Sequence, residues 1–86
     1  MDELKQMRRK IDEVDGQILR FLAERAKICE AIGSAKKAHG LPIKDAVREA
    51  EVYKGVREQA APLGLNPVQV EAVYREIVNM CSSVQE

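Results

Sequence analysis

Three cationic side chains, Arg8, Arg25 and Lys36, lie on or beside the apolar face of one predicted helix at the start of the chain. Arg25 and Lys36 are about three helical turns, or about 16 Å, apart with almost no angular drift, so both point to the same side. Two long cationic side chains at this separation can bind one small anion together. Arg8 lies about 25 Å from Arg25 along the helix, so only the antiparallel helix of a dimer could bring a second Arg8 close.

A simpler interpretation of these cations is also open. Each could be solvated, or could pair with a carboxylate nearby on the same helix, namely Asp12, Asp15 or Glu24. Such pairs are common on exposed helix surfaces and contribute little stability. The regular placement of three cations along one face favours the anion-binding hypothesis.

The element that must position these cations is one uninterrupted helix over about residues 2–39. No proline occurs before Pro42, and apolar residues recur every three or four positions, as a buried helical stripe requires. This stripe consists of Leu4, Met7, Ile11, Val14, Ile18, Phe21, Leu22, Ile28, Ile32 and Ala35. Lysines in the last turn, Gly40 as a left-handed cap and Pro42 beyond it indicate where the helix ends.

The length of this helix predicts an assembly. About 36 helical residues measure about 54 Å, whereas a compact chain of this size has a diameter near 30 Å. The remaining residues therefore cannot cover the apolar stripe, and uncovered stripes of this kind mark interfaces. We expect an intertwined, domain-swapped helical homodimer.

Two further helices are predicted, at about 45–60 and about 66–84. Asp45 can cap the first, and Asn66 followed by Pro67 begins the second. The fold class is therefore all-α, with a three-helix protomer and a single domain over 1–86. Asp45, Arg48 and Glu49 are interpreted either as a cap with an acidic first turn or as the polar wall of a pocket.

Composition excludes several classes of function. The chain has 14 Lys plus Arg, 14 Asp plus Glu and 3% aromatic residues, which argues against a nucleic-acid or membrane-surface binder. One histidine leaves little material for a zinc site or a Ser-His-Asp triad, so we expect no metal and no cofactor. Cys29 and Cys81 are interpreted as reduced core residues, neither a disulfide nor a metal pair. With no signal peptide or membrane span, we expect a cytoplasmic protein.

From Met7 to Gln85, the sequence resembles the all-helical class of chorismate mutase. The resemblance is carried by Met-Arg-Arg-Lys-Ile-Asp-Glu-Val-Asp at 7–15, Leu-Ala-Glu-Arg at 22–25, the segment 33–36, and Pro-Ile-Lys-Asp-Ala-Val-Arg-Glu at 42–49. The last segment is similar to the family's Pro-x-x-Asp-x-x-Arg-Glu signature, and its spacing to Arg25 and Lys36 agrees without insertions. The resemblance implies a free-standing, monofunctional isomerase that converts chorismate to prephenate in phenylalanine and tyrosine biosynthesis. It also implies a domain-swapped dimer in which both chains contribute to each active site.

The resemblance also implies roles for individual cations. Arg8 of the partner chain and Arg25 would bind the two carboxylates of chorismate. Lys36 would reach a carboxylate and the ether oxygen, and Gln85 would donate to the ether oxygen. This Claisen rearrangement needs no nucleophile, metal or proton transfer, but it does need a folded substrate and donors at the oxygen that gains negative charge.

The acidic cluster is given a complementary role by the resemblance. Glu49 and the region of Asp45 would hold the ring hydroxyl, while Arg48 would line the pocket and position the acidic groups. Cys81 departs from the family's pattern, because related sequences can offer a serine hydroxyl to a carboxylate there. Either its thiol substitutes, or Ser82 or a water does.

Gln85 is the second departure, because it is the penultimate residue. Terminal residues fray, so we expect its anchor to come from the substrate or from the partner chain. The catalytic residues implied by the resemblance are therefore Lys36, Gln85, Arg25 and Glu49.

Two other functions remain open. The same scaffold could carry an isochorismate-pyruvate lyase, whose reaction is also pericyclic and would use similar cations. Alternatively, the chain could be a non-catalytic helical dimer that binds a small effector or a protein. The Asp45-x-x-Arg48-Glu49 cluster favours the mutase over the lyase.

Overall fold

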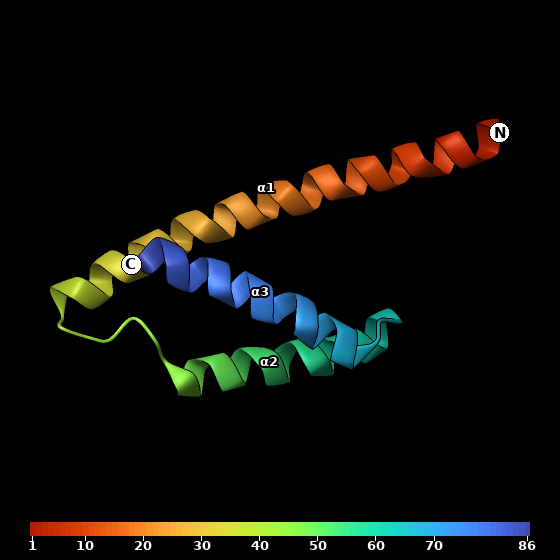
Figure 1. The fold of residues 1–86 in the computed structure, drawn as a ribbon. Helices are drawn as coiled ribbons and strands as arrows, with labels where there is room; N and C mark the ends of the chain where they lie inside the picture. Colours follow the sequence, from red (N-terminus) through yellow and green to blue (C-terminus); the bar gives the residue numbers. More distant parts are fainter.

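The computed structural model describes residues 1–86 and contains three α-helices and no strand. The helices are α1 (Asp2–Ala38), α2 (Ala46–Ala60) and α3 (Pro67–Gln85), and the short 3-10 turn η1 (Ala61–Leu63) follows α2. Figure 1 shows α3 lying between α1 and α2, with the chain's C-terminus against the last part of α1. None of the helices combines the length and the apolar character that a bilayer crossing requires. The predicted all-α, three-helix fold is confirmed, while the single domain over 1–86 stays a prediction.

Local sequence signals account for the helix ends. After α1, Gly40 adopts a left-handed φ of 63°, and the N–H of Leu41 donates to the carbonyl of Lys36 at 2.8 Å. This arrangement satisfies carbonyl groups that a helix end otherwise leaves without a partner. At the start of α3, the side-chain oxygen of Asn66 accepts from the backbone N–H of Val68 at 2.9 Å. These ends fix the connectors and therefore the directions in which α2 and α3 leave them.

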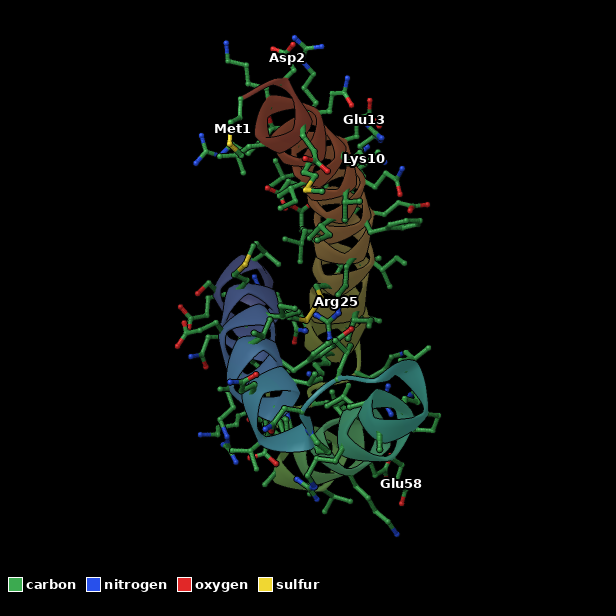
Figure 2. The ribbon with its side chains drawn as sticks, turned by 90° about the vertical axis from the view of Figure 1, so that its right-hand side faces the viewer. Met1, Asp2, Lys10, Glu13, Arg25 and Glu58 are labelled. Atoms are coloured by element: carbon green, nitrogen blue, oxygen red, sulfur yellow. A yellow bond between two sulfur atoms is a disulfide. The ribbon has the colours of Figure 1, made fainter.

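The N-terminal half of α1 projects away from the rest of the chain (Figures 1 and 2). Every residue from 1 to 15 is exposed, and on the apolar stripe Ile11 is 60% and Phe21 67% exposed. The radius of gyration is 16.2 Å, against about 12 Å for a compact chain of this length. The single chain therefore leaves most of its longest apolar stripe uncovered.

A charged cluster joins α2 to the first turns of α3, at the end of α3 that is remote from α1. The carboxylate of Glu71 accepts from Arg57, and from Arg75 at 2.9 and 3.2 Å. The guanidinium of Arg75 also lies 4.4 Å from the centroid of the buried Tyr53 ring. The hydrogen bonds from Arg57 and then Arg75 hold the pKa of Glu71 below its usual value.

Cys29 of α1 and Cys81 of α3 form a disulfide, so the prediction that they are reduced and unpaired is wrong. The two residues are 52 apart in sequence, but their Cα atoms are 5.3 Å apart, within the range that a disulfide spans. The physical reason is that α1 and α3 pack against each other, which brings these two distant residues together. The cytoplasmic location stays a prediction and loses this support, since cytosolic disulfides are rare outside hyperthermophiles.

Replacing Glu71 by Gln is expected to lower the thermal unfolding midpoint at pH 7, because two arginines lose their shared carboxylate. The hydrogen bonds from the two arginines hold the folded pKa of Glu71 below its ordinary value. Its stabilisation is therefore present above the unfolded pKa and is lost as pH falls through the folded one. Circular dichroism melts should show a difference between wild type and Glu71→Gln that is largest at pH 7 and shrinks toward about pH 3.

The control for this measurement is Glu58→Gln. Glu58 pairs only with Lys54, at 4.0 Å on the exposed surface, so its removal should change the midpoint little at any pH. A difference between wild type and Glu71→Gln that stays constant across pH would contradict the role given to Glu71.

Candidate active site

A pocket of about 420 Å³ opens between the C-terminal half of α1, the connector 39–45, the start of α2 and the end of α3. Its walls are part apolar and part charged, as pockets for small polar ligands are. The apolar wall consists of Ile28, Ile32, Ile43, Val52 and Val78. The remaining lining residues are Arg25, Cys29, Lys36, Asp45, Arg48, Glu49, Cys81, Ser82 and Gln85.

The structure brings together all but one of the residues that the sequence assigned to a site. Those that line the pocket are Arg25, Lys36, Asp45, Arg48, Glu49, Cys81 and Gln85. Arg8 does not line it and lies in the exposed first part of α1. A role for Arg8 in this pocket therefore requires a second chain.

Arg25 and Lys36 are half-buried cations that form no ion pair with a carboxylate. The guanidinium of Arg25 has only a weak contact, from Nη1 to the sulfur of Cys29 at 3.7 Å. Lys36 Nζ donates to the carbonyl of Ile43 and to Gln85 Oε1. Pairing with neighbouring carboxylates on α1, one of the open interpretations, is therefore not observed. Partly desolvated cations without counter-charge favour the binding of an anion.

Gln85 is only 7% exposed although it lies in the last turn of α3. Lys36 Nζ donates to Gln85 Oε1 at 2.8 Å, and because an ammonium group only donates, this contact fixes which way the amide faces. The Nε2 group of Gln85 donates to the sulfur of Cys81 at 3.1 Å and keeps a second N–H. The expectation that Gln85 needs a substrate or partner chain as its anchor is therefore wrong, because its own chain anchors it.

The acidic cluster combines both interpretations given by the sequence. Asp45 caps α2, since its Oδ1 accepts from the backbone N–H of Arg48 at 3.0 Å, and it also lines the pocket. The guanidinium of Arg48 bonds to Glu51 at 3.4 Å rather than to Asp45 or Glu49. Glu49 forms no hydrogen bond or ion pair through its side chain, so its carboxylate is free to accept from a ligand hydroxyl.

The disulfide changes what Cys81 can do in the pocket. A bonded sulfur carries no S–H, so the thiol of Cys81 cannot donate to a ligand carboxylate, and that alternative is wrong. Ser82 lies on the same pocket wall, and its role as the donor stays a prediction.

Two features of the site were not found from the sequence. The main-chain carbonyl of Ile43 holds Lys36, and no side-chain pattern signals a carbonyl ligand. Gly33 is buried where α3 approaches α1, and a glycine inside a helical stripe was the available signal.

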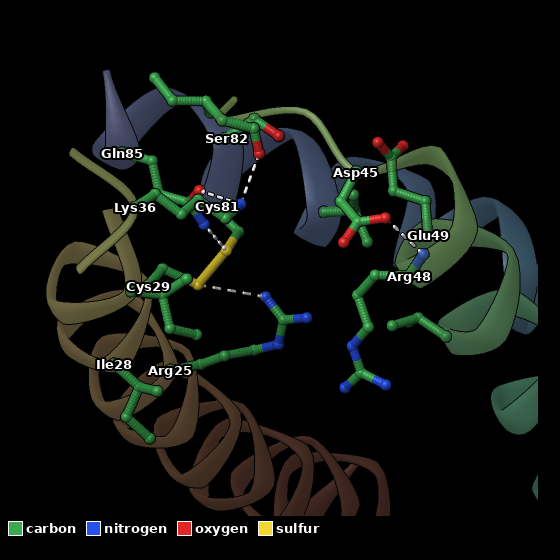
Figure 3. Close-up of a pocket in the computed structure, with 14 residues that line it drawn as sticks. Arg25, Ile28, Cys29, Lys36, Asp45, Arg48, Glu49, Cys81, Ser82 and Gln85 are labelled. Atoms are coloured by element: carbon green, nitrogen blue, oxygen red, sulfur yellow. Dashed lines mark hydrogen bonds between the residues drawn. A yellow bond between two sulfur atoms is a disulfide. The ribbon is translucent and has the colours of Figure 1, made fainter. Parts of the chain in front are cut away.

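The arrangement suits a small anion that also carries a hydroxyl group. Figure 3 shows Arg25 and Lys36 on one side of the pocket and Asp45 and Glu49 on the other. The cations can bind carboxylates, and the unpaired carboxylate of Glu49 can accept a hydrogen bond from a hydroxyl. Lys36 and Gln85 present adjacent N–H donors. No group of three His, Cys, Asp or Glu side chains is placed to hold a metal ion.

Comparison with known proteins gives a consistent result. The family model of chorismate mutase type II matches residues 7–86. The bifunctional chorismate mutase/prephenate dehydratase of Aquifex aeolicus is 37% identical over 89 residues, covering 100% of this chain and 25% of that protein. The chorismate mutase of Methanocaldococcus jannaschii is 36% identical over 58 residues, covering 67% of this chain and 59% of that protein. This chain therefore spans only part of these relatives.

A solved structure shares the fold. A conserved hypothetical protein from Pyrococcus furiosus superposes with a TM-score of 0.81 at 32% identity. The superposition covers 100% of this chain and 99% of that one. The long first helix and its two shorter partners therefore form a fold that a second chain also adopts.

The two roles of Asp45 can be separated by two substitutions. Asp45→Ala removes both the cap and the carboxylate and should lower the free energy of unfolding by about 1 kcal/mol. Asp45→Ser keeps a capping oxygen and removes only the carboxylate, so its stability should stay near that of wild type. Urea unfolding followed by circular dichroism measures both, and equal destabilisation by the two substitutions would show that the cap is not what Asp45 contributes.

Proposed function

The chain belongs to the chorismate mutase type II family, and on this premise we propose that it converts chorismate to prephenate for phenylalanine and tyrosine biosynthesis. The observation that carries the proposal is the pair of half-buried cations, Arg25 and Lys36, that face the pocket without a carboxylate partner. Chorismate is a dianion with a ring hydroxyl, and the pocket offers cations and an unpaired carboxylate, which are complementary to these groups.

The chemistry asked of the pocket is electrostatic. As the carbon–oxygen bond of the ether breaks, negative charge grows on the oxygen, and donors already in place stabilise it without reorganising. Lys36 and Gln85 are the adjacent donors proposed for this oxygen, and their mutual hydrogen bond of 2.8 Å keeps them together. Arg25 would hold a carboxylate through its bidentate guanidinium, which folds the flexible substrate into its reactive shape.

The acidic side of the pocket would orient the ring. Glu49 has no partner in the chain, so it can accept the hydrogen bond of the ring hydroxyl. Asp45 lies beside it, with one oxygen already bonded to the backbone of α2. Arg48 lines the same wall. A cationic and an acidic side together fix the substrate in one orientation.

We propose that the active unit is an intertwined homodimer. The exposed stripe on the first half of α1 supports this, because no part of its own chain covers it. A partner chain that covers the stripe would also bring its own Arg8 toward the pocket, adding the second carboxylate-binding cation.

The activity is tested by mixing the purified protein with chorismate, following the loss of diene absorbance and identifying the product. We expect prephenate. Lys36→Ala and Arg25→Ala should each lower kcat/KM by at least about 100-fold, as removal of a donor to developing charge does. Lys27→Ala, which removes an exposed cation of α1 outside the pocket, is the control and should leave the rate unchanged.

The alternatives predict different products. If the protein forms salicylate and pyruvate from isochorismate, its function is that of a lyase on the same scaffold and the mutase proposal is wrong. If the protein is a folded dimer that turns over neither substrate, the non-catalytic binding protein is the remaining hypothesis. Near wild-type activity of Lys36→Ala would refute the site assignment.

The dimer is tested by sedimentation at micromolar concentration, where wild type should be dimeric. Ile11→Lys puts a charge on the exposed stripe and should shift the protein toward monomers, with loss of activity. Glu13→Gln makes the same change in net charge about 200° round the helix and should remain dimeric. A monomeric wild type would contradict the proposal.

A further inference from the structure

We propose that Gly33 and the Cys29–Cys81 disulfide are positioning residues that hold Gln85 in the pocket, so that opening the disulfide lowers the rate of the reaction. The catalytic part of this inference rests on the proposed function. Its structural part, that these residues fix the last turn of α3, stands on the packing alone.

The last turn of α3 needs an explanation because helix ends fray. The final carbonyl groups of α3 have no partners within the helix, so the helix itself holds its last turn only weakly. Gln85 is nevertheless among the few buried residues of the chain. Something other than the helix itself must therefore hold it against α1.

Gly33 provides the first contact. A Cβ atom built on Gly33 would lie 2.8 Å from the Cα and 3.0 Å from the Cβ and Cγ of Gln85. The nearest of these is a backbone atom, so it cannot rotate away as the end of a flexible side chain would. Only glycine lets the end of α3 come this close to α1.

The disulfide provides the second contact, one helical turn earlier. Cys29 precedes Gly33 by four residues and Cys81 precedes Gln85 by four, so the two contacts lie one above the other on the same faces. A covalent bond at one turn and a close backbone approach at the next leave α3 little freedom to slide or rotate on α1. Figure 3 shows the disulfide beside Gln85, Lys36 and Arg25.

The disulfide also touches the polar groups directly. Gln85 Nε2 donates to the sulfur of Cys81 at 3.1 Å, and Arg25 Nη1 lies 3.7 Å from the sulfur of Cys29. Together with the bond from Lys36 to Gln85 Oε1, these contacts leave the amide of Gln85 one orientation. The disulfide therefore fixes the direction of the Gln85 amide as well as the position of α3 on α1.

Opening the bond is a defined chemical step. A dithiol such as dithiothreitol passes two electrons and two protons to the sulfurs of Cys29 and Cys81, the S–S bond breaks, and the dithiol becomes a cyclic disulfide. Cys81 is half-buried on the pocket wall, so a thiolate of the reagent can attack its sulfur through the pocket and release the sulfur of Cys29. The protein then keeps every charged group of the site and loses only the tie between the helices.

The test compares the oxidised protein with the dithiothreitol-treated protein, with Cys29→Ala/Cys81→Ala and with Gly33→Ala. We expect kcat for chorismate to fall about tenfold or more in all three, with a smaller change in KM, because Arg25 and Lys36 still bind the carboxylates. Dithiothreitol should have no effect on Cys29→Ala/Cys81→Ala, since the chain has 2 cysteines in all. If Gly33→Ala does not fold, the cysteine variant and the reduced protein carry the test.

A second comparison asks whether the disulfide acts through Gln85. In Gln85→Ala, reduction should cause little further loss of kcat, because the side chain that the bond positions is gone. A tenfold loss on reduction in Gln85→Ala as well would overturn the positioning role and leave a bond that only stabilises the fold. Unchanged kcat in the reduced wild type would overturn it too.

Hydrogen exchange separates this inference from the proposed function. On reduction, the amides of residues 82–86 should exchange about tenfold faster or more, while those around Tyr53 and Glu71 should not change. If the oxidised protein does not act on chorismate but this local loss occurs, the proposed function fails and the structural positioning stands. If exchange at 82–86 is unchanged, the positioning fails whatever the activity.

Discussion

The pocket depends on how closely the end of α3 approaches α1. Gly33, the Cys29–Cys81 disulfide and the bond from Lys36 to Gln85 all lie within about two turns of α1. Ordinary packing places helix axes about 8–10 Å apart with side chains between them. Here Gly33 has no side chain at the contact, and the Cys29–Cys81 disulfide joins the two helices directly. The amide of Gln85 therefore lies next to the ammonium group of Lys36. Without this approach the two donors would belong to separate surfaces.

The length of α1 sets the second constraint. Its C-terminal half forms a pocket wall, while its N-terminal half carries both the uncovered apolar stripe and Arg8. In the proposed dimer, covering the stripe and supplying Arg8 would be one event, since both belong to the same rigid segment. Assembly and completion of the site would then be thermodynamically coupled, and any ligand that needs the partner's Arg8 would stabilise the dimer.

Local signals explain what could be predicted from the sequence. The helical course of α1, the caps at Asp45 and Asn66 and the turn at Gly40 depend on neighbours within a few residues, and the structure confirms each of them. The family resemblance identified residues that the fold gathers into one pocket. The disulfide and the anchor of Gln85 were predicted wrongly because both depend on the register between α1 and α3. That register is set by packing between residues 52 apart, which no short pattern reveals.

The two ends of α3 have different roles. At its first turns, Glu71 ties α3 to α2 through Arg57 and Arg75, and at its last turn Gln85 completes the pocket. These residues are about 21 Å apart along the helix, beyond the range at which the effects of substitutions usually couple. Substitutions at the end of α3 that contacts α2 can therefore raise or lower the thermal stability of the chain without changing the reactivity of the pocket. Evolution and protein engineering alike can vary the two properties independently along one helix.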